Sequence, residues 1–323
     1  MVDAEPHISM QIDPEFLTSN VAVHATLRGL VSAPVHIRLE GLNVAGSIKL
    51  TPALRMVMDL ETSGRLSRGS HVIESSSGNL GVALSVICAA RGYPFTCVTD
   101  PNASAQACKA MEAAGAKVII VDQRDQNGGF LNTRIELIRQ LCARDPTYVW
   151  INQYANESNW LAHYSRTARE ILTTFHGKVD WLLVGAGTTG TLMGCGRFFK
   201  EHSPATRVIA IDAAGSVIFG QPPAKRYIPG IGATRTPEIL DTAFVDEVVY
   251  VDEMHTIRMC RALALCGLLV GGSTGSVLAG AELLTRQIGP DDTIVAISAD
   301  MADKYLDTIY NDQWVNARFP AVS

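Results

Sequence analysis

The sequence predicts an α/β protein of two lobes, each a mostly parallel sheet flanked by helices. Short β-branched segments alternate with helix-length segments from about residue 70 onward. These short segments are continuously apolar, as in parallel strands that helices cover on both faces. The chain has 323 residues, more than the ~100–200 residues of a usual domain, so it has room for two such sheets. In this fold class ligands bind at the carboxyl ends of the strands.

The first group of elements ends near residue 152 and belongs to a smaller lobe, which we place at residues 46–152. Ala-rich and amphipathic segments indicate its helices, and Val- and Ile-rich segments indicate its strands. The expected helices are 52–59, 81–91, 103–114 and 131–143, and the expected strands are 71–73, 95–98, 117–121 and 148–152.

The second group repeats the alternation and belongs to a larger lobe, which we place at residues 1–45 and 153–323. The boundary between the lobes is expected in the loop 153–159. A Gly- and Pro-rich stretch at 215–235 has little periodicity and indicates a long loop, and loops of that length are usually functional. The expected strands are 181–184, 208–211, 247–251 and 293–297, with helices between them.

The composition excludes several classes of protein. With 27 Lys and Arg against 32 Asp and Glu the net charge is −5, so no basic surface is expected for nucleic acid or an anionic membrane. No apolar run approaches the ~20 residues that cross a bilayer. The acidic residues 1–5 lack the basic start and apolar core of a signal peptide. We therefore expect a cytoplasmic protein that acts on small molecules.

The cysteine and histidine patterns indicate neither disulfides nor a metal site. The seven cysteines form no Cys-x-x-Cys pair, and several, such as Cys88, lie in apolar runs. We interpret them as small buried hydrophobic residues in a reducing compartment. The eight histidines show no spacing suited to metal binding.

A glycine-rich turn, Gly-Ala-Gly-Thr-Thr-Gly at residues 185–190, lies between an apolar strand and a helix. Such a turn lets backbone N–H groups approach a phosphate, and the helix N-terminus adds a favourable dipole. The turn also matches the G-x-G-x-x-G pattern of dinucleotide-binding proteins, and Asp212 ends the next strand where a ribose-binding acid would lie. An NAD-dependent dehydrogenase is therefore an alternative, as is a tight turn without a ligand.

A second polar turn, Glu-Ser-Ser-Ser-Gly-Asn-Leu-Gly at residues 74–81, also joins a strand to a helix. Its hydroxyls, amide and backbone donors suit a carboxylate or a phosphate. Serines that merely cap the helix are the alternative.

Two more segments carry one reactive or polar group each. Lys49 follows small residues in Gly-Ser-Ile-Lys-Leu. An isolated lysine is usually a surface group, but desolvation would lower its pKa and make the amine available for a Schiff base. Ser273 lies in Gly-Gly-Ser-Thr-Gly-Ser, where an ordinary N-cap is the alternative.

In this order the four segments resemble the cysteine synthase/cystathionine β-synthase family of fold type II pyridoxal-phosphate enzymes. Gly-Ile-Gly at residues 230–232 and Gln-Tyr-Ala-Asn at 153–156 are similar to further segments of that family. The resemblance covers nearly the whole chain, whereas the dehydrogenase alternative explains one segment. It implies pyridoxal phosphate between the two lobes, closure of roughly residues 80–135 over the substrate, and a homodimer. A member that only binds a partner is a third, non-enzymatic alternative, which the intact Lys49 and phosphate loop disfavour.

The resemblance implies a role for each matching residue. Lys49 would hold the cofactor as an internal aldimine and shuttle the α-proton, Asn79 would hydrogen-bond the ring hydroxyl oxygen, and Ser273 would contact the pyridine nitrogen. The phosphate would be cradled by Gly185, Ala186, Gly187, Thr188 and Thr189. The substrate's α-carboxylate would be bound by Ser76, Ser77, Asn79 and Gln153.

The serine at position 273 has a chemical consequence. A serine, unlike an aspartate, does not keep the pyridine nitrogen protonated, so the ring is a weaker electron sink. Loss of a good β-leaving group to give an aminoacrylate is then favoured, and a nucleophile can add to it. We therefore expect a transferase that carries out β-replacement rather than transamination or racemisation.

Departures from the common family pattern indicate a branch. Leu50-Thr51 replaces the usual Asp-Arg, Leu80 replaces a frequent Thr, and the phosphate loop differs from Gly-Thr-Gly-Gly-Thr. These departures argue against ordinary cysteine synthesis. The segments Ser-Ser-Ser-Gly-Asn-Leu-Gly-Val-Ala-Leu at 75–84, Asn-Gln-Tyr-Ala-Asn at 152–156 and Pro-Gly-Ile-Gly-Ala at 229–233 look like the N-(2-amino-2-carboxyethyl)-L-glutamate synthases, which make a 2,3-diaminopropionate precursor of staphyloferrin B-type siderophores. The resemblance implies O-phospho-L-serine as electrophile and L-glutamate as nucleophile. Cysteine synthesis from O-acetylserine or O-phosphoserine and sulfide is the alternative.

Two arginines are candidates for binding these anionic substrates. A phosphate leaving group and a nucleophile with two carboxylates call for cations, ideally arginines with bidentate geometry. Arg235 follows the segment 230–233, and Arg134 lies in the helix after the glycines at 128–129. An ordinary surface position is the alternative for each.

Overall fold

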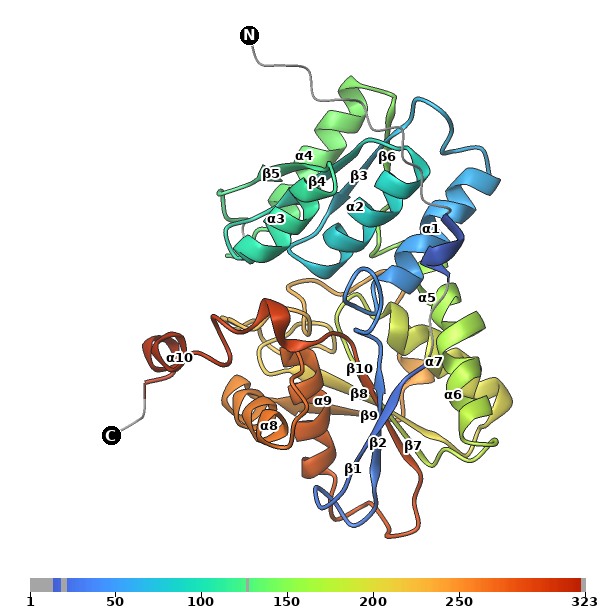
Figure 1. Ribbon diagram of the computed structural model, residues 1–323, viewed down its shortest axis with the longest axis vertical. Coiled ribbons are helices and arrows are strands. Elements are labelled where there is room, and N and C mark those ends of the chain that lie inside the picture. Colours follow the sequence, from blue (N-terminus) through green and yellow to red (C-terminus); the bar gives the residue numbers. More distant parts are fainter. Residues whose placement is uncertain (1–13, 19–21, 126–127, 321–323) are drawn as a thin grey trace.

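The chain folds into two α/β lobes, which lie one above the other in the computed structural model (Figure 1). The structure describes residues 14–18, 22–125 and 128–320. A four-stranded sheet forms the smaller lobe and a six-stranded sheet forms the larger one. The expected α/β class with two sheets is confirmed.

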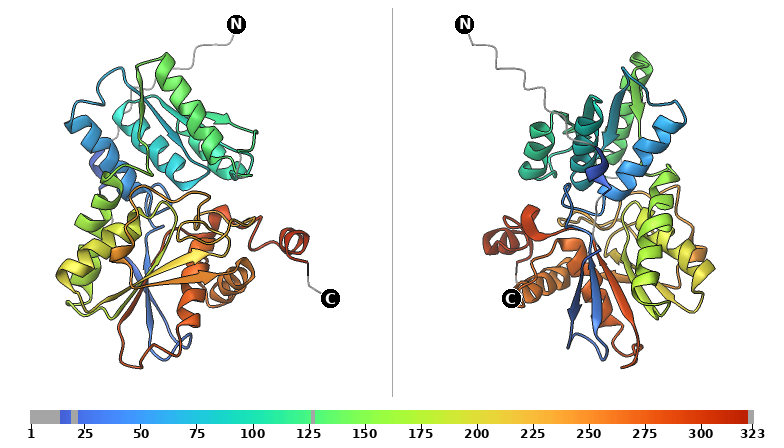
Figure 2. Two further views of the ribbon diagram at one scale, coloured as in Figure 1. Left: turned by 180° about the vertical axis from the view of Figure 1, so that it is seen from behind. Right: turned by 45° about the vertical axis from the view of Figure 1, so that its right-hand side comes forward.

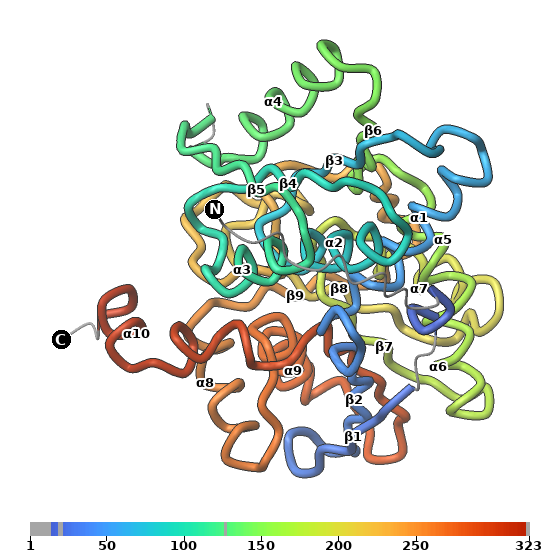
Figure 3. The backbone as a smooth tube through the Cα atoms, turned by 45° about the horizontal axis from the view of Figure 1, so that its top comes forward, coloured from blue at the N-terminus to red at the C-terminus, as the bar shows by residue number. Residues whose placement is uncertain are grey.

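The smaller sheet is entirely parallel, with the strand order β5-β4-β3-β6. Helices α2 and α3 lie on one side of it and α4 on the other, as Figure 3 shows. Val72 packs on the α2 side and its neighbour Ile73 on the α4 side, which explains why the strand is continuously apolar. The elements are α1 (Leu50–Thr62), β3 (His71–Ser75), α2 (Asn79–Arg91), β4 (Phe95–Thr99), α3 (Ala105–Ala113), β5 (Lys117–Ile120), α4 (Leu131–Arg144) and β6 (Tyr148–Trp150).

The larger sheet has the order β1-β2-β10-β7-β8-β9, in which only β1 runs antiparallel to its neighbour. Its strands are β1 (His24–Leu27), β2 (Val35–Leu39), β7 (Trp181–Gly185), β8 (Arg207–Ala213), β9 (Glu247–Val251) and β10 (Ile294–Ser298). Its longer helices are α7 (Gly190–His202), α8 (Glu253–Leu265) and α9 (Gly272–Leu283). Shorter helical segments are η1 (Pro14–Leu17), α5 (Ser158–Ala162), η2 (His163–Ala168, a π-helix), α6 (Arg169–Thr174), η3 (Thr242–Phe244), η4 (Ala302–Lys304) and α10 (Asp312–Arg318).

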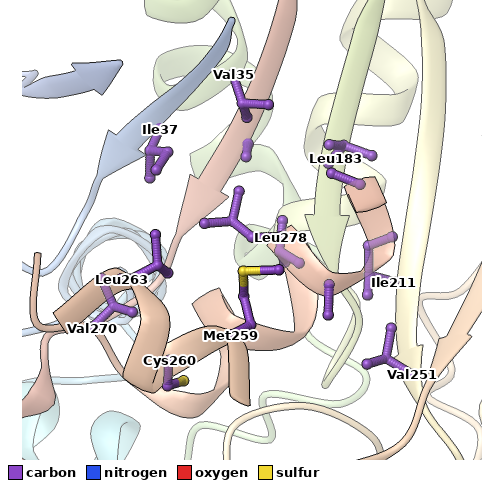
Figure 4. Packing of buried hydrophobic residues seen from close by; sticks show 14 of the residues in the cluster. Val35, Ile37, Leu183, Ile211, Val251, Met259, Cys260, Leu263, Val270 and Leu278 are labelled. Carbon is purple, nitrogen blue, oxygen red and sulfur yellow. The ribbon is translucent and has the colours of Figure 1, made fainter. Parts of the chain in front are cut away.

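Helices cover both faces of the larger sheet as well. Leu183 and Ile211 face α9, where they pack with Leu278 in the core seen in Figure 4. Leu182 and Val184 point to the opposite face, toward Phe199 and its neighbours in α7. Alternate residues of one strand therefore enter two different cores.

Most expected elements are present, with shifts of a few residues at their ends. The expected long loop is confirmed, because residues 214–241 contain neither helix nor strand. The sequence did not predict β1, β2 or α10, the last of which lies at the outer edge of the larger lobe (Figure 2).

The cysteines are all free thiols, but they are not all buried. Cys88, Cys97, Cys195 and Cys260 are buried, whereas Cys266 is exposed. The expectation of burial is therefore wrong for Cys266, which follows the last residue of α8, and it holds only in part for Cys108 and Cys142, which are half-buried. Within the described ranges no three His, Cys, Asp or Glu side chains gather as a metal site would require.

None of the helices in the described part of the chain is both long and apolar enough to cross a membrane.

Candidate active site

Lys49 lies where the two lobes meet, at the start of α1. The backbone N–H of Ile48 donates to the carbonyl of Ala299 at 2.7 Å, and Ser47 bridges to Asp300, so the residues before Lys49 are tied to the end of β10. Burial lowers the pKa of Lys49, and the nearby Asp300 carboxylate opposes this shift. A lysine with a lowered pKa beside a carboxylate is suited to Schiff-base chemistry.

Asp300 is a carboxylate of this site that the sequence did not identify. It is 1% exposed and lies two residues after the end of β10. Its Oδ2 accepts hydrogen bonds from Asn79 Nδ2 and Tyr305 Oη, both at 2.7 Å. Its Oδ1 lies 3.5 Å from the Ser273 hydroxyl. Burial raises the pKa of Asp300, and its hydrogen bonds and the two neighbouring lysines oppose this shift. An acidic residue shortly after an apolar strand was the available signal.

The glycine-rich turn lies between β7 and α7, as expected. Its backbone is held by two bonds: Ala186 N–H donates to Ile211 O at 2.8 Å, and Gly232 N–H donates to Ala186 O at 2.7 Å. The loop around residue 230 therefore packs on the turn, and the carbonyl of Gly230 lies 3.4 Å from a β-carbon built on Gly187. On its other side, Gly230 faces Ser273.

Three observations on this turn fit a phosphate group. Thr189 has a φ of 65°, which is unusual for a β-branched residue and typical of strained functional turns. Its Oγ1 is buried without a hydrogen-bond partner. The turn also stands at the N-terminus of a 13-residue helix, where backbone N–H groups have no partner inside the helix.

Asn159 supports the turn and was missed by the sequence analysis. It is 3% exposed, and its Nδ2 donates to Gln153 O at 2.7 Å and to Thr188 Oγ1 at 3.3 Å. Asn159 thereby links the segment 153–156 to the phosphate turn. The sequence analysis placed Asn159 in a loop between the lobes, whereas it lies in the short helix α5, and a lone asparagine gave no signal of this role.

Asp212 does not take the position that a dehydrogenase requires. It ends its strand as expected, but it is 0% exposed and its Oδ1 accepts from the backbone N–H of Ala213. Burial raises its pKa to about 6, and the charge of Arg226 opposes the shift. Asp212 is buried and bonded to the backbone of its own strand, so its position gives the dehydrogenase alternative no support.

The second polar turn is built as expected, but its serines have unequal surroundings. Ser76 Oγ accepts from the N–H groups of Gly78 and Gly81 at 3.2 and 3.0 Å, so its hydroxyl caps the start of α2. Ser77 is half-buried. Gln153 lies beside them and donates through Nε2 to Ser75 O at 3.0 Å. The turn and Gln153 therefore form one polar surface at the ends of β3 and β6.

Glu74 anchors this surface from behind. It is 1% exposed and accepts from the N–H groups of Ser75 at 2.6 Å and Gln153 at 3.1 Å. Burial raises its pKa to about 7, against the effect of these hydrogen bonds. Glu74 thus couples the position of Gln153 to strand β3.

The two candidate arginines lie around Tyr154. Burial raises the pKa of the Tyr154 hydroxyl, and the charges of Arg134, Arg235 and Arg226 oppose that shift. Arg134 is 8% exposed, lies 3.3 Å from Asp100, and has Nε and Nη1 atoms without a hydrogen-bond partner. Arg235 stacks over the Tyr154 ring at 5.4 Å and pairs with an exposed glutamate. The sequence did not identify Arg226.

Known proteins share this architecture. The family model of pyridoxal-phosphate dependent enzymes matches residues 21–300. A hydrogen sulfide-producing enzyme from Fusobacterium nucleatum is 28% identical, with a TM-score of 0.84 over 92% of this chain and 100% of that one. O-ureido-L-serine synthase is 28% identical, with a TM-score of 0.83 over 95% and 96% of the two chains. A mutant of that synthase with O-ureido-L-serine bound is 27% identical, with a TM-score of 0.85 over 94% and 97%.

The match at residues 21–300 covers both sheets and includes Lys49, Asn79, the turn at 185–190 and Ser273. The buried free hydroxyl and the helix N-terminus of that turn fit a phosphate, and Lys49 is a buried lysine with a lowered pKa. The chain therefore belongs to the family of pyridoxal-phosphate dependent enzymes, as a cysteine synthase-like enzyme of the β-replacing type.

Proposed function

We propose that the enzyme joins O-phospho-L-serine and L-glutamate to give N-(2-amino-2-carboxyethyl)-L-glutamate and phosphate, as a step of siderophore biosynthesis. Bound pyridoxal phosphate supplies the ring that makes the α-hydrogen of the serine ester acidic. Lys49 binds the cofactor and moves the α-proton through its Nζ. Ser273 and Asn79 contact the ring, and residues 185–189 hold the phosphate.

The substrate's α-carboxylate is assigned to the polar surface of Ser76, Ser77, Asn79 and Gln153, to which Asn79 contributes its backbone N–H at the start of α2. This surface offers hydroxyl, amide and backbone donors. The hydrogen bond from the backbone N–H of Gln153 to Glu74 keeps Gln153 in place while the carboxylate binds.

The cluster of arginines around Tyr154 is the single observation that supports the two anionic substrates. Tyr154 adjoins Gln153 in the chain, and Arg235 stacks over the Tyr154 ring, so we assign the leaving group to the side of these arginines. Arg134 already pairs with the buried Asp100 at 3.3 Å, but its buried Nε has no hydrogen-bond partner, which leaves a donor for a bound anion. Neither acetate as leaving group nor sulfide as nucleophile requires such a cluster, whereas phosphate and glutamate do.

Cysteine synthesis is the competing function. The fold is shared with an enzyme named for hydrogen sulfide production, and sulfide would need no cation. The same architecture is also shared with an O-ureido-L-serine synthase, whose named product is a different serine derivative.

The decisive experiment compares the two serine esters. Purified enzyme is mixed with O-phospho-L-serine or O-acetyl-L-serine, the cofactor absorbance is followed, and glutamate or sulfide is then added. We expect a spectral change with phosphoserine that reverses only with glutamate, and the coupled product in the mass spectrum. Faster reaction of O-acetylserine, reversed by sulfide, would instead identify a cysteine synthase.

Arginine variants sharpen this test. We expect Arg134→Gln and Arg235→Gln to lower kcat/KM for phosphoserine by about tenfold or more, the usual effect of losing a charged hydrogen bond. The exposed Arg258→Gln on α8 is the matched control.

Three properties of the whole molecule are proposed on the sequence resemblance. The smaller lobe comprises residues 46–152 and the larger lobe the rest of the chain. The strands of the smaller sheet all lie between residues 46 and 152. Residues 80–135 close over the substrate. The enzyme is a cytoplasmic homodimer, which sedimentation of the purified protein would test.

A further inference from the structure

Asn79 is held from two sides by charged residues of the other lobe. It begins α2 in the smaller lobe, whereas Asp300 and Lys304 follow β10 in the larger lobe. Lys304 Nζ lies 2.5 Å from Asn79 Oδ1. Asp300 Oδ2 lies 2.7 Å from Asn79 Nδ2.

The chemistry of these two partners allows only one orientation of the amide. An ammonium group can only donate hydrogen bonds, and an ionised carboxylate can only accept them. Asn79 must therefore turn its oxygen to Lys304 and its NH2 group to Asp300. A reversed amide would place two donors against each other at Lys304 and two acceptors against each other at Asp300.

The charged pair is itself firmly placed. Asp300 is 1% exposed and also accepts from Tyr305 Oη at 2.7 Å. Burial lowers the pKa of Lys304, and the charges of Asp300 and Asp303 oppose this shift. Burying the charges of Asp300 and Lys304 costs desolvation free energy. A contact between two neutral side chains would join the lobes without that cost.

We propose that Asp300 and Lys304 are positioning residues, which fix the Asn79 amide with its NH2 group toward the ring oxygen of the cofactor. The inference rests on the proposed role of Asn79. One hydrogen of Nδ2 is used by Asp300, and the second remains for the ring oxygen, which is an acceptor. A freely rotating amide would present its own oxygen to that acceptor part of the time and repel it.

The first test titrates the apoprotein with pyridoxal phosphate and records the absorbance spectrum of the bound cofactor. We expect Lys304→Met and Asp300→Asn each to weaken binding about tenfold and to change the ratio of the absorbance bands, because the ring oxygen loses a fixed donor. Lys304→Arg should restore both, since arginine is also a donor-only cation.

A double exchange separates orientation from mere contact between the lobes. In Asn79→Asp combined with Asp300→Asn, the carboxylate introduced at position 79 still accepts from Lys304, and the amide introduced at position 300 donates to that carboxylate. The contacts between the lobes persist, but position 79 now presents an acceptor to the cofactor. We expect near wild-type thermal unfolding of the apoprotein, with weakened cofactor binding and an altered spectrum.

The outcomes are distinct. Wild-type binding and spectrum in the double exchange would show that the contact only joins the lobes, and would overturn the inference. The inference would also be overturned if Asn79→Ala weakens cofactor binding while Lys304→Met and Asp300→Asn leave it unchanged. Wild-type binding and spectrum in Asn79→Ala would refute the role of Asn79 in the proposed function itself.

Discussion

The side-chain oxygen of Asn159 lies 2.0 Å from the point where a β-carbon at residue 190 would stand. Position 190 therefore has room only for glycine, at the first residue of α7 and directly after Thr189. The close approach lets Asn159 reach the phosphate turn through Thr188. Gly190 of the glycine-rich turn is thus required because of Asn159, which lies outside that turn.

This contact predicts the effect of Gly190→Ala. The added methyl group must displace the buried Asn159, and such overpacking costs about 1–3 kcal/mol of the free energy of unfolding. We expect weaker cofactor binding as well, because the turn loses its support. Denaturant unfolding and cofactor titration measure the two effects. Gly289→Ala is the control, since its β-carbon would meet no atom closer than 3.4 Å. Equal values for the two variants would contradict the prediction.

Lys49→Ala should abolish turnover while the fold is retained. Lys49 directly follows Ile48, whose backbone N–H is bonded to the carbonyl of Ala299, so the variant removes the amine that is held at this position. Borohydride reduction followed by peptide mass spectrometry should find the cofactor on Lys49 in the native enzyme. The surface variant Lys178→Ala should leave both turnover and labelling unchanged. A cofactor adduct on another lysine would refute the assignment.

Ser273→Asp should retain the cofactor but release phosphate from O-phospho-L-serine more slowly. A carboxylate beside the ring nitrogen would favour its protonated form and stabilise a long-lived carbanion. We expect elimination to slow by about tenfold, equivalent to about 1.4 kcal/mol in the barrier. Single-turnover phosphate release measures this, and Ser273→Ala separates loss of the hydroxyl from gain of a charge. Equal rates in Ser273→Asp and the wild type would contradict the argument.

His163 should make the fold sensitive to acid. Its side chain is 1% exposed between Thr167 and Thr191, and burial, together with the charges of Lys49 and Arg38, lowers its pKa to about 3. Below pH 6.5 the unfolded chain binds a proton at this residue that the native chain does not. Stability therefore falls as pH falls, by about 2 kcal/mol between pH 8 and pH 5.

The measurement is denaturant unfolding of the wild type and His163→Gln at both pH values. The variant should lose less stability on acidification, because it has no imidazole to protonate in the unfolded state. An identical loss in the two proteins would show that other groups account for the pH dependence.

The parts of the fold predicted from sequence are those with a strong local pattern. Strands such as β7 and β10 are buried on both faces and read as continuous apolar runs. Strand β2 was missed because it carries His36 and Arg38, and Arg38 is buried only through its pairing with Glu40 and Glu170. Glu40 lies two residues from Arg38, but Glu170 belongs to α6 and is distant in the chain, so the sequence near β2 does not show that the arginine is buried.

The same distinction holds for the site. Lys49 and the phosphate turn are found in the sequence because each is a compact motif. Asp300, Lys304 and Asn159 act on residues that are distant in the chain, so only the assembled lobes bring them together. The role of each depends on a contact with a residue that is distant in the sequence, so the residues around it give no indication of that role.

The pairing of β2 with β10 has a consequence for the order in which the protein is made. Val35 pairs with Ile294, and Ile48 is tied to Ala299, so segments far apart in the chain must meet. The smaller sheet uses only residues 71–150 and can form while the ribosome is still translating the rest. Strand β2 can pair with β1 early, but its other edge stays open until β10 has been made. The active-site lysine, which follows Ile48, is therefore set in place only after β10 has emerged from the ribosome.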